Sequence, residues 1–408
     1  MRGSLAALAA MGGATLAGAG LLAGCGGPTR ASVSEASRST TSVPPSTTST
    51  TVVPASTAPP GTTAFVPRSF TAVSTTHWWV LGSVACGSRD CPIIMTTTDG
   101  GVSFRSLPAP GGSFGPSLNS PPTADTIRFA DSEDGWVFGP ALYATHDGGL
   151  RWTAIPVPGD VTDLEPGRGE VFAVVTPTPA PCARSGTCTS STPAPGLWRA
   201  PPSGDDWSPD PAAGDVSEDL AVHGDSVWVI DSTTTADGPA IGTGLLHSAD
   251  GGDHFALEPE EVTGIACSYS PASDTVVWAY CSGGHFMFAY LSTDAGARFV
   301  PVGPSGAPPT PNNYPNGSTL EAASPTTAVA VNDLPGSPLI RTVDSGATWN
   351  TVAPPPDKSG TWSIIGFTTP DVGYALWQPG PATGMTSTAQ LWRTTDGGAS
   401  WAPVTALP

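Results

Sequence analysis

The chain has 408 residues and a formal net charge of −19, with 34 acidic side chains against 15 lysines and arginines. A surface with that balance repels phosphate backbones and anionic lipid head groups, which excludes nucleic acid as a partner. The 49 glycines and 46 prolines favour turns, and no stretch beyond the N-terminus shows a sustained helical period.

Residues 1–24 are predicted to be an export signal. Met1-Arg2 supplies a positive charge, an apolar run follows, and small residues precede Cys25, which is the order of a secretory signal. Leu22-Ala23-Gly24-Cys25 resembles the lipobox of bacterial lipoproteins, and this resemblance implies cleavage before Cys25 and lipidation of its sulfur. The alternative is an ordinary signal peptide with an incidental cysteine. We expect an extracytoplasmic protein, held at the outer face of the bacterial cell membrane by this lipid only.

Residues 25–64 are rich in serine, threonine and proline and contain few apolar side chains. Such a composition cannot bury a core, so it predicts a disordered, lipid-anchored linker. Its length allows it to hold the following domain away from the membrane. Its threonines are also candidate sites for O-linked sugars.

Residues 65–408 carry a repeated motif, Ser/Thr-x-Asp-x-Gly-x-x-Trp/Phe, with its aspartates at Asp99, Asp147, Asp250, Asp294, Asp344 and Asp396. The gaps between them are 48, 103, 44, 50 and 52 residues. The double gap hides a degenerate copy, in which Leu197-Trp198-Arg199 is followed by Gly204 and Trp207, and Pro202 replaces the aspartate. Each of the resulting seven units contains four short apolar segments separated by turns. The sequence therefore predicts an all-β fold, a seven-bladed β-propeller of four-stranded antiparallel blades.

The aspartate motif falls between the third and fourth strands of each unit. There the Asp can accept hydrogen bonds from its own turn, the glycine can adopt positive φ, and the aromatic residue begins the fourth strand. We interpret these six aspartates as structural rather than metal-binding, because a calcium loop needs several oxygen ligands close together. Second-strand aromatics recur at Trp79, Trp136, Trp228, Trp278 and Tyr374, and we expect them to pack between blades rather than to stack on sugars.

This motif resembles the Asp-box, or BNR, repeat of sialidases, sortilin-type receptors and the photosystem II assembly-factor family. The pattern of Phe129 to Trp136 and of Phe367 to Tyr374 is most similar to the last of these. The resemblance implies a propeller and a scaffold role, and it is weak for function because these families share architecture and not activity.

Six cysteines remain after Cys25, and proximity favours the pairs Cys86–Cys91, Cys182–Cys188 and Cys267–Cys281. Fifteen pairings are possible for six cysteines. Zinc is the alternative, but no CxxC pair has a second pair to match it. The pairs agree with an exported protein.

No catalytic, cofactor-binding or metal-binding signature emerges. Sialidases of the resembled family place the first arginine of a triad in Arg-Ile-Pro, which is absent here, and Arg68 follows Pro67 instead. The acidic clusters Glu258 to Glu261 and Asp205-Asp206 could supply paired carboxylates for glycoside hydrolysis, but in loops they are more simply solvated. The six histidines form no metal-spaced pair, and no nucleophile elbow or phosphate loop occurs.

Antiparallel strands place the aspartate motifs on one face of the ring and the long segments on the other. The long segments are 107–124, 176–196, 231–244, 302–318 and 378–389, and long loops on a rigid scaffold commonly carry binding. We therefore predict a monomeric, non-catalytic binding or assembly scaffold that recognises a protein or a cell-envelope glycan through the long-loop face. The alternative is a secreted glycoside hydrolase. Ring closure stays open, since residues 64–68 could supply a strand to the last blade.

Overall fold

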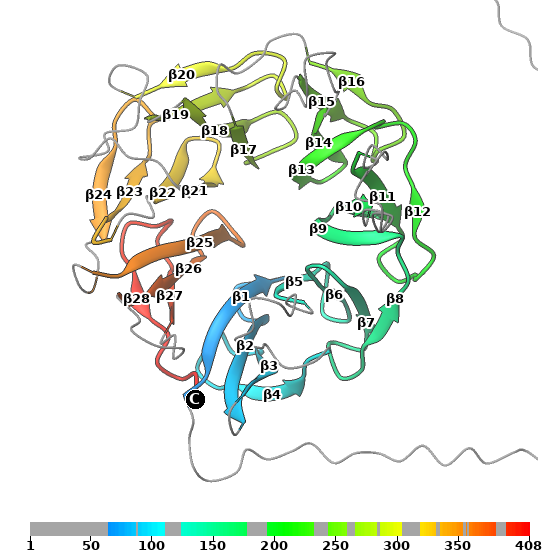
Figure 1. Ribbon diagram of the computed structural model, residues 1–408. Coiled ribbons are helices and arrows are strands. Elements are labelled where there is room, and N and C mark those ends of the chain that lie inside the picture. The colour runs from blue at the N-terminus through cyan, green and yellow to red at the C-terminus, as the bar shows by residue number, and fades with distance from the viewer. Residues whose placement is uncertain are drawn as a thin grey trace, which may run out of the picture. The chain divides into compact units, whose positions relative to one another are not determined.

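The computed structural model describes residues 64–86, 89–110, 124–177, 194–231, 244–258, 266–283, 286–303, 319–331, 335–353, 356, 359–380 and 389–408. These residues form seven four-stranded antiparallel sheets arranged in a ring (Figure 1). The fold is an all-β seven-bladed propeller, as the repeat predicts. Within the described ranges, no helix is long and apolar enough to span a lipid bilayer.

The blades follow one another in chain order. Blades 1 to 4 contain β1 (Val66–Ala72), β2 (Trp78–Cys86), β3 (Arg89–Thr97), β4 (Arg105–Pro108); β5 (Thr126–Phe129), β6 (Asp134–Phe138), β7 (Leu142–His146), β8 (Thr153–Ile155); β9 (Gly159–Pro166), β10 (Val171–Pro177), β11 (Gly196–Ala200), β12 (Ser208–Pro209); and β13 (Val216–His223), β14 (Ser226–Asp231), β15 (Gly244–Ser248), β16 (Ala256–Leu257).

Blades 5 to 7 repeat this plan. They contain β17 (Ala266–Pro271), β18 (Val277–Gly283), β19 (Phe286–Ser292), β20 (Val300–Val302); β21 (Thr319–Ser324), β22 (Thr327–Val331), β23 (Leu339–Thr342), β24 (Asn350–Ala353); and β25 (Thr361–Phe367), β26 (Gly373–Gln378), β27 (Gln390–Thr394), β28 (Ala402–Pro403). In every blade the first strand lines the centre of the ring and the fourth lies at its rim (Figure 1).

Burial differs between the strands of a blade. Second strands such as β6 and β22 are almost continuously buried, because both of their faces pack against neighbouring blades. Fourth strands such as β12 and β16 are two residues long and exposed. Hydrophobic burial is therefore concentrated in the inner half of each blade.

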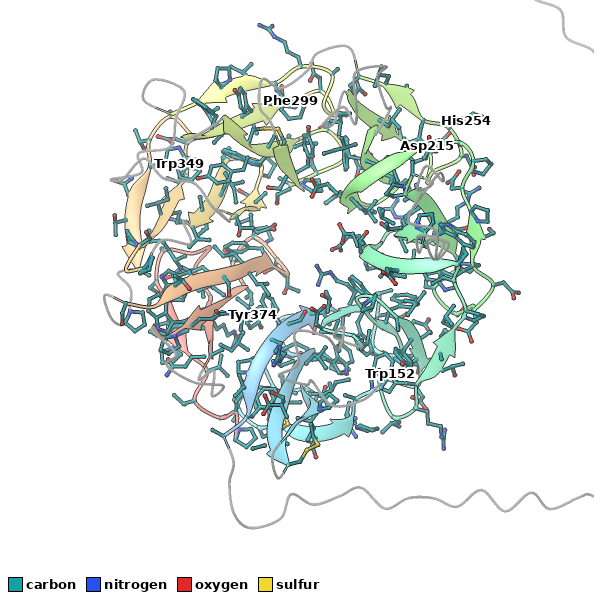
Figure 2. The ribbon with its side chains drawn as sticks, in the orientation of Figure 1. Trp152, Asp215, His254, Phe299, Trp349 and Tyr374 are labelled. Carbon is teal, nitrogen blue, oxygen red and sulfur yellow. A yellow bond between two sulfur atoms is a disulfide. The ribbon has the colours of Figure 1, made fainter. Side chains whose placement is uncertain are left out.

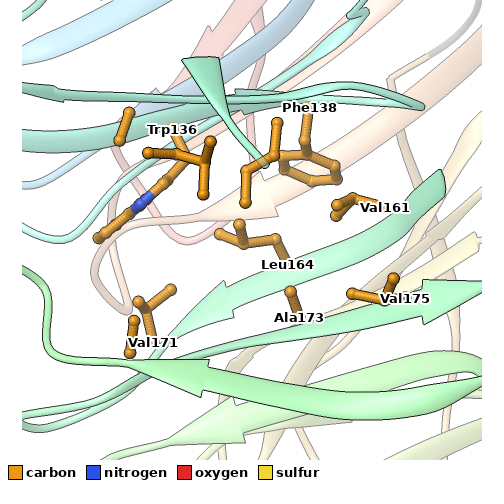
Figure 3. Close-up of a cluster of buried hydrophobic side chains, with 11 residues drawn as sticks. Trp136, Phe138, Val161, Leu164, Val171, Ala173 and Val175 are labelled. Carbon is orange, nitrogen blue, oxygen red and sulfur yellow. The ribbon is translucent and has the colours of Figure 1, made fainter. Parts of the chain in front are cut away.

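The hydrophobic core is divided into seven clusters, and each cluster joins two adjacent blades. Between blades 2 and 3, for example, Trp136 and Phe138 pack against Val161, Leu164 and Val175 (Figure 3). The second-strand aromatics are buried in these clusters, as expected; they are Trp79, Trp136, Trp228, Trp278 and Tyr374. No blade buries its apolar faces alone, so the ring must close.

All four strands of blade 7 come from the C-terminal part of the chain, β25 to β28, and residues 66–72 form the first strand of blade 1. The ring closes by side-chain packing rather than by a borrowed strand. Trp78 of blade 1 lies 4.7 Å from Tyr374 of blade 7 between ring centroids. The amide of Phe65 also donates to the carbonyl of Pro408, at 3.0 Å.

Two predicted disulfides are present. Cys86–Cys91 joins β2 to β3, and Cys267–Cys281 joins directly paired residues of β17 and β18. The third predicted pair, Cys182–Cys188, lies outside the described residues, as do Cys25 and the rest of residues 1–63.

Candidate functional site

The six aspartate motifs share one hydrogen-bond pattern. The Ser or Thr hydroxyl that starts each motif donates to the aspartate Oδ1, as Thr97 does to Asp99 at 2.7 Å. The amide four residues after the aspartate donates to the same oxygen, as Ser103 does at 3.0 Å. The same bonds form at Asp147, Asp250, Asp294, Asp344 and Asp396.

These bonds fix the charge of the motif. Hydrogen bonds from the Ser103 hydroxyl and amide and from Thr97 hold the pKa of Asp99 at about 2. Hydrogen bonds from the His254 side chain and amide and from Ser248 hold the pKa of Asp250 at about 2. The carboxylates thus serve their own turns. No group of three His, Cys, Asp or Glu side chains suited to a metal ion occurs in the described part of the chain.

The aromatic residue of each motif lies immediately before the fourth strand rather than in it. Phe299 and Trp349 are buried, whereas Phe104 and Trp152 are only half-buried. The expectation that these aromatics begin the fourth strand is therefore wrong by one residue. They cover the edge of the core beside the turn.

A contact that the sequence did not indicate joins the motif to the preceding blade. The carbonyl of the residue after the aspartate accepts a side-chain N–H bond across five of the seven interfaces. The donor–acceptor pairs are Trp79–Gly148 at 3.1 Å, Arg199–Gly251 at 3.4 Å, Trp228–Ala295 at 2.8 Å, Arg341–Gly397 at 2.6 Å and Arg393–Gly100 at 2.7 Å. We call these bonds the interblade clasps. They assign Arg199, Arg341 and Arg393 to the assembly of the ring.

Two members of the acidic clusters considered for glycoside hydrolysis contact histidine rings, whereas Asp206 is exposed. Asp205 accepts from the His146 ring at 3.2 Å, and Glu258 contacts the His247 ring at 3.2 Å. Glu260 and Glu261 lie outside the described residues.

The candidate site is a cavity of about 640 Å³ at one end of the central channel, which we call the channel pocket. Its walls include Val66 at the start of β1, Asp125 just before β5, Phe138 at the end of β6 and Gln378 at the end of β26. First strands begin and second strands end on the long-loop face. The pocket therefore opens on the long-loop face, opposite the aspartate motifs, where binding was predicted. Most of the long segments themselves fall outside the described residues.

The channel pocket combines charges of both signs with one exposed apolar side chain. Its charged lining is Arg68, Asp125, Arg128, Asp163 and Asp219. Ile364 is 42% exposed and has a φ of 46°. That conformation is strained for a β-branched residue, and such strain concentrates at functional sites.

In the wall of the pocket, Arg128 faces several carboxyl groups. Arg128 Nε donates to Glu165 Oε1 at 2.7 Å, and the two side chains keep 29% exposure each because they face the channel. Burial opposes the charge of Arg128, but the carboxylate of Glu165 more than offsets it and raises the pKa of the guanidinium. Figure 2 shows side chains of the inner strands pointing into the centre of the ring.

Two further inner-strand carboxyl groups connect neighbouring blades. Asp163 Oδ2 accepts from the Leu220 amide of blade 4 at 3.1 Å. Glu321 Oε2 accepts from the Ser270 hydroxyl of blade 5 at 2.8 Å, and Ser270 Oγ in turn accepts from the Ala322 amide at 2.9 Å. These groups hold first strands side by side around the channel.

Both of these carboxyl groups have a raised pKa. Burial, and then the charge of Glu165, raise the pKa of Asp163 to about 7 against the opposing charge of Arg128. Burial also raises the pKa of Glu321 to about 7, although its hydrogen bond from Ser270 acts in the opposite direction. Strongly shifted carboxyl groups beside a cavity mark a candidate functional site.

No protein-family model matches this sequence, and no curated protein matches it. Among solved structures, the chain is similar to "YCF48 bound to D1 peptide", with 18% identity over 82% of this chain and 94% of that chain and a TM-score of 0.50. It is also similar to YCF48 from Cyanidioschyzon merolae, with 15% identity over 83% and 97% of the two chains and a TM-score of 0.51. YCF48 is a photosystem II assembly factor, of the group that the sequence pattern resembles.

A third similar structure is the acylaminoacyl peptidase of Pyrococcus horikoshii, with 10% identity over 84% of this chain and a TM-score of 0.52. This chain spans only 52% of the peptidase. At these identities the likeness establishes the propeller fold and no shared activity.

Proposed function

We propose that this protein is a non-catalytic binding module that receives a segment of a protein partner in the channel pocket. The observation that carries the proposal is the pocket itself, about 640 Å³ with charged groups of both signs and the exposed, strained Ile364. Cavities of this size with a few convergent polar groups are typical binding sites. An apolar side chain and fixed charges together suit a polypeptide segment.

The likeness to YCF48 supports this proposal. One of the similar structures is described as bound to a D1 peptide, so a propeller of this architecture can hold a peptide. A cell-envelope glycan is the other partner class that we predict from the sequence.

The proposed setting is the outer face of the bacterial cell membrane. Lipid on Cys25 would anchor the protein, and residues 25–64 would hold the propeller away from the bilayer. The protein would act there as a monomeric scaffold without a cofactor.

A photo-crosslinking residue at position 364 provides the test. It would be introduced into the full chain in cells, and the captured polypeptide would be identified, purified and titrated against the protein. Crosslinking of a polypeptide does not by itself show that it binds in the pocket. The decisive measurement is therefore the dissociation constant of that polypeptide for two matched variants of the protein.

Thr162 and Thr153 supply that matched pair, because both are exposed strand threonines. Thr162 lines the pocket on β9, whereas Thr153 lies on β8 at the rim. Thr162→Trp should fill the pocket and weaken binding at least tenfold, and Thr153→Trp should leave it unchanged. Equal affinities for the two variants would reject the pocket as the binding site.

The second candidate is a glycoside hydrolase, and the raised pKa of Asp163 beside a cavity favours it, since a glycosidic acid must stay protonated near neutral pH. Against it, Asp163 Oδ1 and Oδ2 already accept the amides of Leu164 and Leu220. A panel of fluorogenic glycosides discriminates the two functions. Turnover that is abolished by Asp163→Asn would overturn the binding-module proposal.

A further inference from the structure

The inner wall of the channel holds more negative groups than its cation can neutralise. Arg128 on β5 is the cation that interacts with this group of acids, which are Asp163 and Glu165 on β9 and Glu321 on β21. The charge of Arg128 acts on Asp163 and on Glu321, and Glu165 also acts on both. The first strands of blades 2, 3 and 6 therefore interact electrostatically across the channel.

Glu165 takes the direct contact with the arginine. Arg128 Nε donates to Glu165 at 2.7 Å, and its Nη1 donates to the carbonyl of Ile127 at 3.1 Å. Asp163 and Glu321, which are both half-buried, are left with weaker compensation. Three carboxylates against one guanidinium is an unfavourable state in a site of low dielectric constant.

Asp163 and Glu321 are also the groups that bridge blades. Asp163 accepts the Leu220 amide between blades 3 and 4, and Glu321 accepts the Ser270 hydroxyl between blades 5 and 6. A change in their charge is thus applied directly at two joints of the ring.

The other ionisable groups that face this cluster come from the surrounding first strands. Arg68 on β1 and Asp125 before β5 lie toward the mouth of the pocket, with Asp219 on β13. Tyr269 on β17 is kept neutral, because burial and then the charge of Asp219 raise the pKa of its hydroxyl. These groups carry two negative charges and one positive charge, so they do not relieve the excess of acid.

We propose that protonation of Asp163 and Glu321 controls how tightly the inner strands hold together, which makes the channel a pH-sensitive part of the fold. With both groups protonated, Arg128 and Glu165 form a balanced pair. When both protons leave, the cluster gains two negative charges, and the repulsion between the first strands that carry them opposes the hydrogen bonds that the ionised carboxylates still accept at the two joints. Because Asp163 also lines the pocket, the same change alters the charge that an incoming partner meets.

The direction of the effect follows from linkage. Both carboxyl groups have pKa values raised to about 7 in the folded protein, while in an unfolded chain they titrate near 4. The stability that the protons provide is complete below about pH 4 and is lost as the pH rises to about 7. Above that pH no further change is expected from these groups.

Carboxyl ¹³C NMR titration of the folded full chain tests the proposal without unfolding. Two carboxyl signals should titrate near neutral pH, one absent in Asp163→Asn and the other in Glu321→Gln. Glu165→Gln should shift the midpoints of both signals to lower pH, because it removes a neighbouring negative charge. Midpoints below pH 5 for both signals in the wild-type protein would overturn the proposal.

Denaturant unfolding at several pH values provides the second measurement. As the pH rises from about 5 to about 6.5, each of the two carboxyl groups should raise the equilibrium constant of unfolding by up to about tenfold per pH unit, because the unfolded chain has already lost the proton that the folded chain still holds. Each single variant should remove its share of this slope, and Asp371→Asn, an exposed carboxyl on the turn before β26, should remove none. If the unfolding constant depends on pH in both Asp163→Asn and Glu321→Gln as it does in the wild-type protein, the proposal that protonation of these groups stabilises the ring is refuted. Neither result depends on partner binding, so the proposed function can fail independently.

Discussion

Removal of the Arg393 side-chain charge should weaken the ring where its first and last blades meet. Arg393 donates from Nη1 to the Gly100 carbonyl at 2.7 Å and from Nη2 to the Thr75 carbonyl at 3.2 Å. Its guanidinium carbon also lies 5.9 Å from the centroid of the Trp78 ring. Arg393→Met keeps much of the aliphatic stem and removes all three interactions.

The expected cost follows from these contacts. A hydrogen bond that involves a charged group contributes about 1.5–3 kcal/mol, and a partly exposed cation–π contact about 0.5–1 kcal/mol. Because the side chain is half-buried and methionine still packs on Trp78, we expect a loss of about 2–4 kcal/mol in the free energy of unfolding. Arg341→Met is the matched control, since Arg341 makes the same clasp to Gly397 between blades 6 and 7.

Two measurements separate closure of the ring from general destabilisation. Denaturant unfolding gives the free energy, and native-state hydrogen exchange reports the Phe65 amide, which donates to Pro408 across the closure. Arg393→Met should speed exchange at this amide, and Arg341→Met should not. A loss below about 1 kcal/mol, or equal acceleration of Phe65 in both variants, would refute the closure role.

Four further predictions concern the aspartate motif and the anchor. Because hydrogen bonds hold the pKa of Asp99 at about 2, its contribution to stability is present above about pH 4 and is lost as the pH falls toward 2, so Asp99→Asn should flatten the acid limb of a pH–stability curve. Gly346→Ala should destabilise the protein by about 1–3 kcal/mol in denaturant unfolding, since the φ of Gly346 is 83° and an added Cβ would lie 2.6 Å from Val302 Cβ. Ser345→Gly should stabilise the protein by about 0.5–1 kcal/mol in the same assay, because Ser345 has a φ of 57°, which glycine adopts without strain. Cys25→Ala should move the protein from the membrane fraction to the soluble fraction, and continued membrane retention would exclude lipidation.

The period and the composition of each unit were sufficient to predict the blades. A turn motif recurs with its own spacing, so even the copy that lost its aspartate at Pro202 could be placed by Trp198 and Trp207. The strands that it predicts are β11 and β12. Local chemistry determines these features, and a local pattern is visible in one sequence.

The channel cluster could not be predicted in this way because its members come from different blades. Arg128 contacts Glu165, 37 residues later in the chain, and Asp163 accepts an amide 57 residues later. A signal was nevertheless present. Charged residues stand between apolar ones in several first strands, as Arg128 does between Ile127 and Phe129, and strand alternation points such residues toward the channel.

The interblade clasps explain why the residue after each aspartate can vary. The clasp uses a backbone carbonyl, so either glycine or Ala295 can occupy the position while its left-handed φ is preserved. What the motif must keep is the turn that presents this carbonyl to the preceding blade, and the aspartate holds that turn.

Blade 3 supports this explanation because it lacks the aspartate. At its interface with blade 2, a contact between the side chains of His146 and Asp205 takes the place of the clasp, with Nε2 and Oδ1 3.2 Å apart. Asp205 lies in the very turn where the motif was lost. The same interface retains a complete hydrophobic cluster, with Trp136 at 0% exposure. Apolar packing between blades therefore holds the ring together at every interface, and the motif is one of two ways to add a directional bond at its edge.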